Sequence, residues 1–192
     1  MKSILRKLGC LLLTLVVLFQ FAACTDEYVD VKTYGNFFSD ISTTPLLVFP
    51  EKIPQSAEVN QYYFGKDSTL LFDDYQLMLD CSLSQEDFEK ECGRLSSLNY
   101  TVNVGETGEQ VNKEILLDTE HFNCESAYVA QYTDSEYEYA LVYEGENRIV
   151  YVYLRYMPDE VAFDKNYLPT GEVDESTEYS MYSTSVTVQV EV

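Results

Sequence analysis

Hydrophobic and polar residues alternate through the second half of the chain in a way that predicts three antiparallel strands. The stretch ESAYVAQYTDSEYEYALVYEGENRIVYVYLRYM, residues 125–157, contains three runs rich in Val, Tyr and Leu. Asp134–Ser135 and Gly145–Glu146 separate the runs, and two-residue connections of this kind suit tight β-hairpins. The pattern therefore predicts a meander of three neighbouring strands.

A helical period occurs in the segment SLSQEDFEKECGRLSSL, residues 82–98. Apolar residues recur there at the spacing of one helix face, at Phe88, Cys92, Leu95 and Leu98. Ser84 is a suitable N-cap, and Asp87 occupies the third helical position, where a capping box places its acidic partner. We therefore expect the principal helix to cover about residues 84–98.

Strand-like runs also precede and follow this helix. Two runs within residues 57–82 are separated by Gly65–Ser68, which predicts a hairpin there. In the second run, four side chains of one parity should share a face: Tyr75, Leu77, Leu79 and Cys81. Shorter candidates are 99–104 and 113–118, and the end of the chain, 183–192, alternates strictly. Strands, one helix and more strands predict an α+β fold, mainly an antiparallel sheet with the helix packed on one face.

The parity of the meander predicts which of its faces is exposed. With two-residue turns, one face carries Tyr128, Ala130, Tyr132, Tyr137, Tyr139, Leu141, Val150, Val152 and Leu154. The other carries Val129, Gln131, Glu138, Ala140, Val142, Ile149, Tyr151, Tyr153 and Arg155. Because polar side chains are costly to bury unpaired, we expect the second face to be the outer one.

Outward orientation of that second face makes it a candidate interaction face, because a contiguous exposed apolar patch often marks a binding site. Its members are Val142, Ile149, Tyr151 and Tyr153. Two alternatives stay open. A one-residue change in a loop would invert the faces, and the last strand or the segment after residue 24 could cover them.

The N-terminal segment MKSILRKLGCLLLTLVVLFQFAAC has the three parts of a secretory signal peptide. Three basic residues precede an apolar run from Leu8 to Phe21, and Ala22 and Ala23 then precede Cys24. The sequence FAAC resembles the lipobox of bacterial lipoproteins. This resemblance implies that residues 1–23 are removed and that Cys24 is lipidated to become the new N-terminus. The alternatives are an ordinary signal peptide or an uncleaved anchor, with Cys24 incidental.

The resemblance implies a location on the extracytoplasmic face of a bacterial cell membrane, held by two or three acyl chains. It leaves open whether the host has one membrane or two. Residues 24–44 lack a sustained period and are predicted to form a tether, followed by a single α+β domain over 45–192. Without the signal peptide, 169 residues remain, which is enough for one domain.

Charge narrows the choice of partners. Nine basic and 33 acidic residues follow position 23, so the mature formal charge is −24. Nucleic-acid binding depends on Lys and Arg neutralising phosphates, so this balance argues against it. A basic protein partner remains compatible with the charge, and so do divalent cations.

No arrangement of residues characteristic of a catalytic or metal site stands out in the sequence. The single histidine, His121, forms one His-x-x-Cys pair with Cys124, whereas structural zinc typically takes four ligands. The acidic loops do not match a calcium-binding loop, and the glycines at 105 and 108 lack the rest of a phosphate-binding motif. We therefore expect no metal, no cofactor and no enzymatic activity.

Three further cysteines follow Cys24, at positions 81, 92 and 124, and their disulfide state is open. A helix returning from a strand that ends at Cys81 would carry Cys92 too far away for that particular bridge.

The expected function is a non-enzymatic binding or accessory module for another envelope or secreted protein. An immunity protein that neutralises a basic toxin belongs to this group. The alternative is a lipoprotein that binds carbohydrate or another cell-wall ligand.

Overall fold

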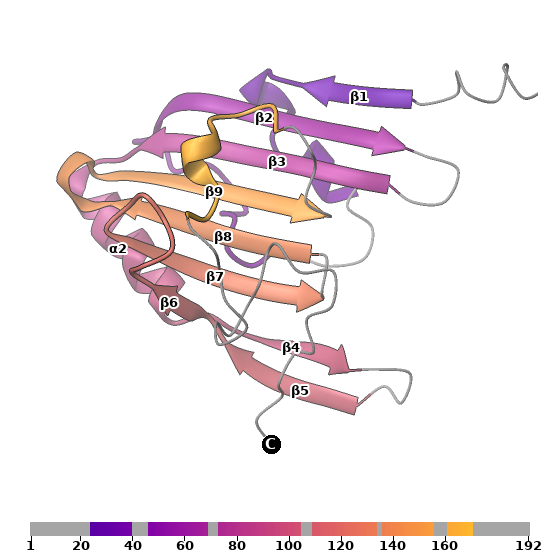
Figure 1. The fold of residues 1–192 in the computed structure, drawn as a ribbon. Coiled ribbons are helices and arrows are strands. Elements are labelled where there is room, and N and C mark those ends of the chain that lie inside the picture. Colours follow the sequence, from indigo (N-terminus) through magenta and orange to yellow (C-terminus); the bar gives the residue numbers. More distant parts are fainter. Residues whose placement is uncertain are drawn as a thin grey trace, which may run out of the picture.

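The computed structural model of the chain describes residues 24–39, 46–68, 73–104, 109–133, 136–155 and 161–170. Seven strands form one antiparallel sheet in the order β1-β2-β3-β9-β8-β7-β6 (Figure 1). They are β1 (Cys24–Tyr28), β2 (Glu58–Ser68), β3 (Asp73–Ser82), β6 (Leu116–Asp118), β7 (Ser126–Thr133), β8 (Glu136–Tyr143) and β9 (Arg148–Arg155). A separate hairpin pairs β4 (Asn99–Val104) with β5 (Glu109–Glu114). With the helix α2 (Gln85–Ser96), this confirms the predicted α+β class.

The principal helix forms where its period predicts it. Ser84 is the N-cap, and its Oγ accepts the backbone N–H of Asp87 at 3.2 Å. The reciprocal half of the capping box runs through Ser56, whose hydroxyl donates to the Asp87 carboxylate and accepts the Ser84 N–H. At the other end the Ser97 N–H donates to the carbonyl of Arg94, so the helix stops slightly before the expected residue 98.

The predicted meander is present, with one correction to its register. Strands β8 and β9 pair as expected, from Glu136 with Arg155 to Tyr143 with Arg148. Between β7 and β8, a bulge at Gln131–Thr133 shifts the pairing by one residue. A one-residue shift moves every following side chain to the opposite face. Tyr128 and Ala130 therefore share a face with Tyr151, contrary to the prediction.

The first hairpin turns later than the sequence indicated. Strand β2 continues through Gly65 to Ser68, and the connection to β3 lies at 69–72, outside the described residues. The shared face of β3 is confirmed, because Tyr75, Leu77, Leu79 and Cys81 belong to one buried cluster. The alternating segment 183–192 lies outside the part of the chain that the structure describes.

The prediction that residues 24–44 form a tether is wrong for 24–39. Strand β1 pairs with β2 along its whole length, from Cys24 opposite Ser68 to Tyr28 opposite Phe64. Two short 3-10 turns follow, η1 (Val31–Thr33) and η2 (Asn36–Ser39), and Phe37 is buried in the core. The segment shows no period because its core residues come from turns and not from one long regular element.

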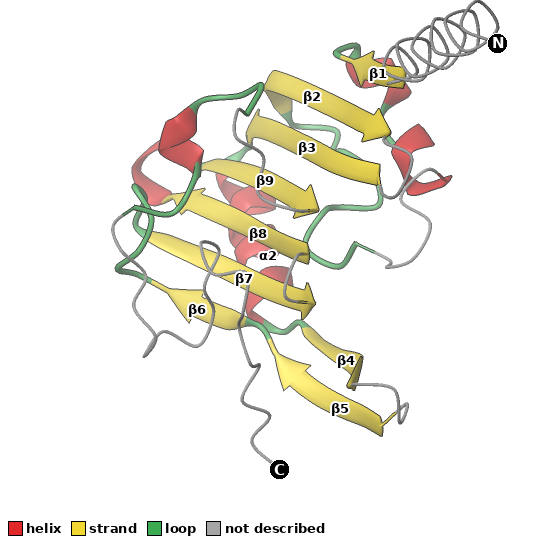
Figure 2. Ribbon diagram, turned by 45° about the vertical axis from the view of Figure 1, so that its right-hand side comes forward, coloured by secondary structure: helices red, strands yellow, loops and turns green. Residues whose placement is uncertain are grey.

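Both faces of the sheet are covered. One face, here called the helix face, includes Leu79 and Tyr151 and packs against α2, residues 46–50 and the turns after β1. The opposite face, here called the loop face, includes Met78 and Val152 and packs against Phe122 and residues 161–170. These latter residues include the 3-10 turn η4 (Lys165–Tyr167). Figures 1 and 2 show α2 and η4 on opposite sides of the sheet.

The expected exposure of the candidate interaction face is wrong. Ile149, Tyr151 and Tyr153 are 0% exposed and Val142 is 2% exposed, all within the helix-face cluster. This surface lies beneath α2 and residues 46–50, so it is part of the core. The prediction assumed that polar side chains buried on this face would have no hydrogen-bond partners. Glu138 is buried, but its carboxylate accepts hydrogen bonds.

Candidate functional site

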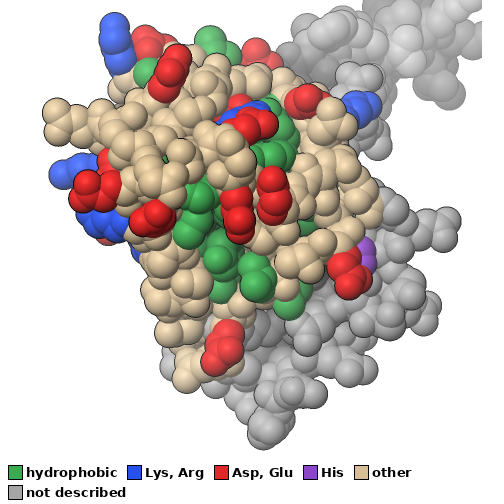
Figure 3. All heavy atoms as spheres, turned by 90° about the vertical axis from the view of Figure 1, so that its left-hand side faces the viewer, with side chains coloured by type: hydrophobic (Ala, Val, Ile, Leu, Met, Phe, Trp, Pro, Cys, Tyr) green, Lys and Arg blue, Asp and Glu red, His purple; other side chains and the backbone are tan. Residues whose placement is uncertain are grey.

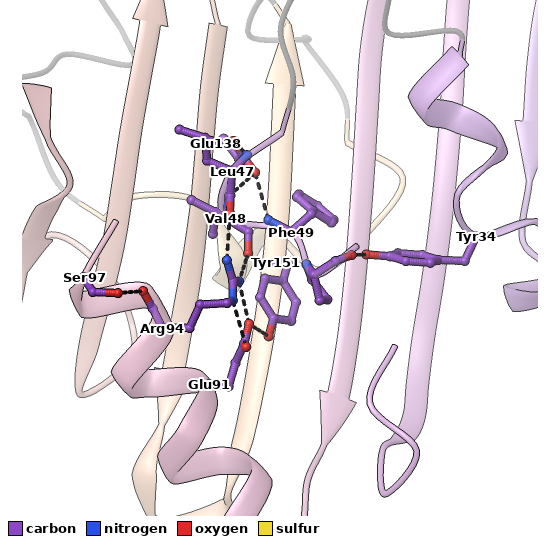
Figure 4. Close-up of polar contacts among 10 residues, drawn as sticks. Tyr34, Leu47, Val48, Phe49, Glu91, Arg94, Ser97, Glu138 and Tyr151 are labelled. Carbon is purple, nitrogen blue, oxygen red and sulfur yellow. Dashed lines mark hydrogen bonds and ion pairs between the residues drawn. The ribbon is translucent and has the colours of Figure 1, made fainter. Parts of the chain in front are cut away.

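Residues 46–50, here called the strap, lie across the helix face without belonging to any strand. The carboxylate of Glu138 accepts three successive backbone N–H groups of the strap, from Leu47 at 3.0 Å, Val48 at 2.6 Å and Phe49 at 2.9 Å. Figure 4 shows these bonds converging on Glu138. A buried carboxylate thus replaces the neighbouring strand that such a segment lacks.

The carbonyl groups of the strap are bound from the other side by α2. Arg94 donates to the carbonyl oxygens of Leu47 at 2.8 Å and Val48 at 2.5 Å. The same guanidinium also makes two hydrogen bonds to the Glu91 carboxylate, which in turn accepts the hydroxyl of Tyr151 at 2.8 Å. Burial, reinforced by the Glu91 charge, raises the pKa of Tyr151 well above its ordinary value, so it remains a donor.

These contacts explain why the parity argument failed. Glu138 is 0% exposed, and burying a carboxylate is costly unless hydrogen bonds compensate for lost hydration. Here three charge-assisted bonds supply that compensation. The donors lie about ninety positions earlier in the chain, where no local pattern connects them to Glu138. Since these hydrogen bonds hold the strap against the sheet, we assign this network a structural role.

A second buried ion pair lies near one end of the sheet. Asp80 accepts two hydrogen bonds from Arg148, each at 2.8 Å, and two more from Asn60 and Tyr167. The guanidinium also faces the rings of Tyr143 and Tyr167, with its central carbon 4.9 and 5.7 Å from their centroids. Hydrogen bonding to Asp80 raises the pKa of Arg148 further above its ordinary value. The pair attaches η4 to the loop face.

The side chains of His121 and Cys124, the His-x-x-Cys pair, contact residues close to them in the sequence. His121 Nδ1 lies 2.9 Å from Asp118 Oδ2, while Asp118 Oδ1 accepts the backbone N–H groups of Glu120 and His121. The Cys124 thiol donates to the carbonyl of Ser126 at 3.2 Å. Among the described residues, no three His, Cys, Asp or Glu side chains gather as a metal site would require. Glycines 105 and 108 lie outside those residues.

The cysteines at 81, 92 and 124 are free thiols. Burial raises the pKa of Cys81 to about 12 and that of Cys124 to about 11. Because the thiolate is the reactive form, both are poor nucleophiles near neutral pH.

A different surface combines half-buried apolar groups with exposed acids, around the 3-10 turn η3 (Glu144–Glu146). We call it the turn patch. Its half-buried members are Cys92, Cys124, Tyr128 and Tyr143, and its exposed acids are Glu125, Glu144 and Glu146. Figure 3 shows the end of the molecule that carries η3, with hydrophobic side chains gathered mid-face and acidic side chains beside them.

Cys92 and Tyr128 pack against the helix-face cluster, and Cys124 and Tyr143 pack against the loop-face cluster, so the turn patch wraps around the end of the sheet at η3. Burial is the main cause that raises the pKa values of Cys92 and Tyr128, and the Glu144 charge adds to both shifts. On the other side of η3, burial and then Cys124 raise the pKa of Tyr143. The two groups meet at η3, where Tyr143 and Glu144 are adjacent in the chain.

Sequence reasoning placed a turn at Gly145–Glu146 but missed the patch around it. The sequence offered one signal for this patch: Tyr143 at the end of a predicted strand is followed by Glu144 and Glu146. The contributions of Cys92 and Cys124 come from α2 and from the loop before β7, so they depend on the tertiary fold.

Comparison of the chain with protein-family models, with curated proteins and with solved structures gave no match. Of the helices in the described ranges, none has the length and apolar character needed to cross a membrane.

Proposed function

We propose that this protein is a lipid-anchored, extracytoplasmic binding module without enzymatic activity. Cys24 carries the anchor, and the turn patch binds a basic segment of another envelope or secreted protein. An immunity or inhibitor protein that neutralises a basic toxin is one form of this function.

The proposed anchor is supported by the sequence FAAC at residues 21–24, which resembles a lipobox and assigns the new N-terminus to Cys24. Several acyl chains on one residue are sufficient for stable membrane attachment.

The observation that carries the binding role is the turn patch itself. Three exposed glutamates border half-buried tyrosines, and the nearby cation Arg148 is already engaged by Asp80 and Glu146. Incoming Lys or Arg side chains would find the carboxylates of Glu125 and Glu144 for ion pairs and the ring of Tyr128 for a cation–π contact. The mature charge of −24 adds long-range attraction for a basic partner.

The binding role is tested by crosslinking capture from native cells with two matched charge reversals. One variant carries Glu125→Lys and Glu144→Lys in the turn patch. The control carries Glu51→Lys and Glu114→Lys, which make the same charge change at two exposed sites elsewhere. We expect a protein captured by the wild type and the control to be absent with the patch variant, and its capture to weaken at high salt.

Equal capture by both variants would remove the patch from the proposal. Capture of no protein, together with retention of the wild type on cell-wall glycan, would replace it with the carbohydrate hypothesis. The anchor is tested separately by mass spectrometry of the mature N-terminus. An acylated Cys24 is expected in the wild type, and a Cys24→Ala variant should lack the modification.

A further inference from the structure

The anchor and the fold are joined without intervening chain. Cys24 is itself a strand residue, paired with Ser68 of β2. Lipid attached at this position would hold the edge of the sheet at the bilayer surface, whereas a tether of twenty residues would have let the domain move freely. The absence of slack restricts which surfaces of the domain can face the lipid.

Two exposed apolar side chains, Tyr28 and Val29, lie at that same edge. Within the described residues, three large hydrophobic side chains are exposed: Tyr28 at 40%, Val29 at 72% and Leu117 at 55%. Two of them are consecutive and stand at the far end of β1 from Cys24. Leu117 belongs to β6, at the opposite edge of the sheet. Tyr28 stacks on Phe64 with a centroid distance of 5.7 Å, so its ring is held in place.

Strand geometry sets the separation between the two ends of this edge. At about 3.4 Å per residue, the Cα atoms of Cys24 and Tyr28 lie about 14 Å apart. The outer side of β1 pairs with no other strand in the described part of the sheet. Tyr and Val at such a position suit the interface of a membrane, where an aromatic ring keeps its apolar body in contact with lipid and its hydroxyl in water.

We propose that the β1 edge lies flat on the lipid surface, with acylated Cys24 at one end and Tyr28 and Val29 at the other. The proposal rests on the lipid anchor proposed above. The acids along this edge, Asp26, Glu27 and Asp30, are exposed and disfavour anionic headgroups, so the surface it fits is zwitterionic.

This orientation places the rest of the molecule. Six strand spacings of about 4.8 Å separate β1 from β6, so the sheet would reach about 29 Å above the bilayer. The η3 turn joins β8 and β9, which stand midway in the strand order. The turn patch would then face sideways from the middle of the upright sheet, accessible to a partner in the same membrane or in solution.

The chain contains no tryptophan, so a single introduced tryptophan is a clean reporter. The experiment uses Tyr28→Trp at the proposed membrane edge and Leu117→Trp as the matched control at the opposite edge. Each full-length variant is purified, its acylation is verified by mass spectrometry, and it is reconstituted in phosphatidylcholine vesicles with and without brominated acyl chains. Bromine quenches only an indole that reaches the interface.

We expect Tyr28→Trp to lose about half its emission or more, because interfacial side chains sit roughly 5–10 Å into the headgroup and acyl boundary. Leu117→Trp should be unaffected, and adding Val29→Asp to the first variant should reduce its quenching. Acylated protein with no quenching of Tyr28→Trp, or with equal quenching at both sites, would overturn the orientation while leaving the anchor intact. Protein without acylation would instead overturn the anchor, and the orientation with it.

Discussion

The contact between Glu138 and the strap allows a quantitative prediction. Replacing Glu138 with Gln keeps the shape of the side chain but exchanges one carboxylate oxygen for an NH2 group. In the wild type, Oε1 accepts from Val48 and Phe49, and Oε2 accepts from Leu47. The amide has a single oxygen, so its NH2 group must face at least one backbone N–H donor.

The expected loss of stability follows from these bonds. Leaving one buried N–H without an acceptor costs about 1–3 kcal/mol. The remaining bonds also lose charge assistance, which roughly doubles the strength of a hydrogen bond. Together we expect Glu138→Gln to lower the free energy of unfolding by about 2–4 kcal/mol, a large share of the 5–15 kcal/mol typical of a domain.

Urea unfolding followed by circular dichroism measures this loss. Glu51→Gln, at an exposed site just after the strap, is the control and should change stability by no more than about 0.5 kcal/mol. Hydrogen exchange adds a local readout, because the amides of residues 47–49 should exchange faster in Glu138→Gln while those of α2 change less. A variant as stable as the control, with strap amides still protected, would refute the role assigned to Glu138.

Three other predictions concern buried polar and thiol groups. Asp80→Ala should destabilise the protein by about 3 kcal/mol in urea unfolding, because Arg148 would lose its buried partner. Burial and neighbouring acids raise the pKa of Asp74. The ionised carboxylate therefore lowers the stability of the folded protein at pH values above this raised pKa. The loss of stability disappears as the pH falls and the carboxylate becomes protonated. Asp74→Asn should therefore stabilise the protein at neutral pH, by no more than about 0.5 kcal/mol because solvent screens this partly exposed carboxylate, with the gain vanishing below about pH 3.5 in thermal melts. Cys81 should resist a thiol reagent at pH 8 until urea unfolds the chain, because its thiol is buried with a pKa of about 12, and Cys124 should react slowly.

Elements defined by nearby residues were predictable from the sequence. The cap at Ser84 and the apolar spacing that follows it place α2, because helix signals lie within a few residues of one another. Strict alternation and a short turn likewise place β8 and β9 in their observed register. The shared face of Leu77, Leu79 and Cys81 follows from the same period of two.

The bulge in β7 shows the limit of that approach. Alternation predicts which side chains share a face only while the strand stays regular. One extra residue at Gln131–Thr133 places the side chains of Tyr128 and Ala130 on the face opposite to the predicted one. Strand β7 contains no Gly or Pro that would have indicated a bulge. The turn patch depends in part on this inversion, because it places Tyr128 on the side of Cys92 and Glu144.

The sequence by itself determined the class of the fold, the principal helix and the meander. Only the tertiary structure decided which surfaces are buried. Glu138 could enter the core because three N–H groups of the strap reach it from about ninety residues away. Tyr151 is covered for the same reason, since α2 and the strap pack over it. Local periodicity predicts which side chains share one face of a strand. Whether that face is exposed to solvent depends on segments that are distant in the sequence and pack over it only in the folded protein.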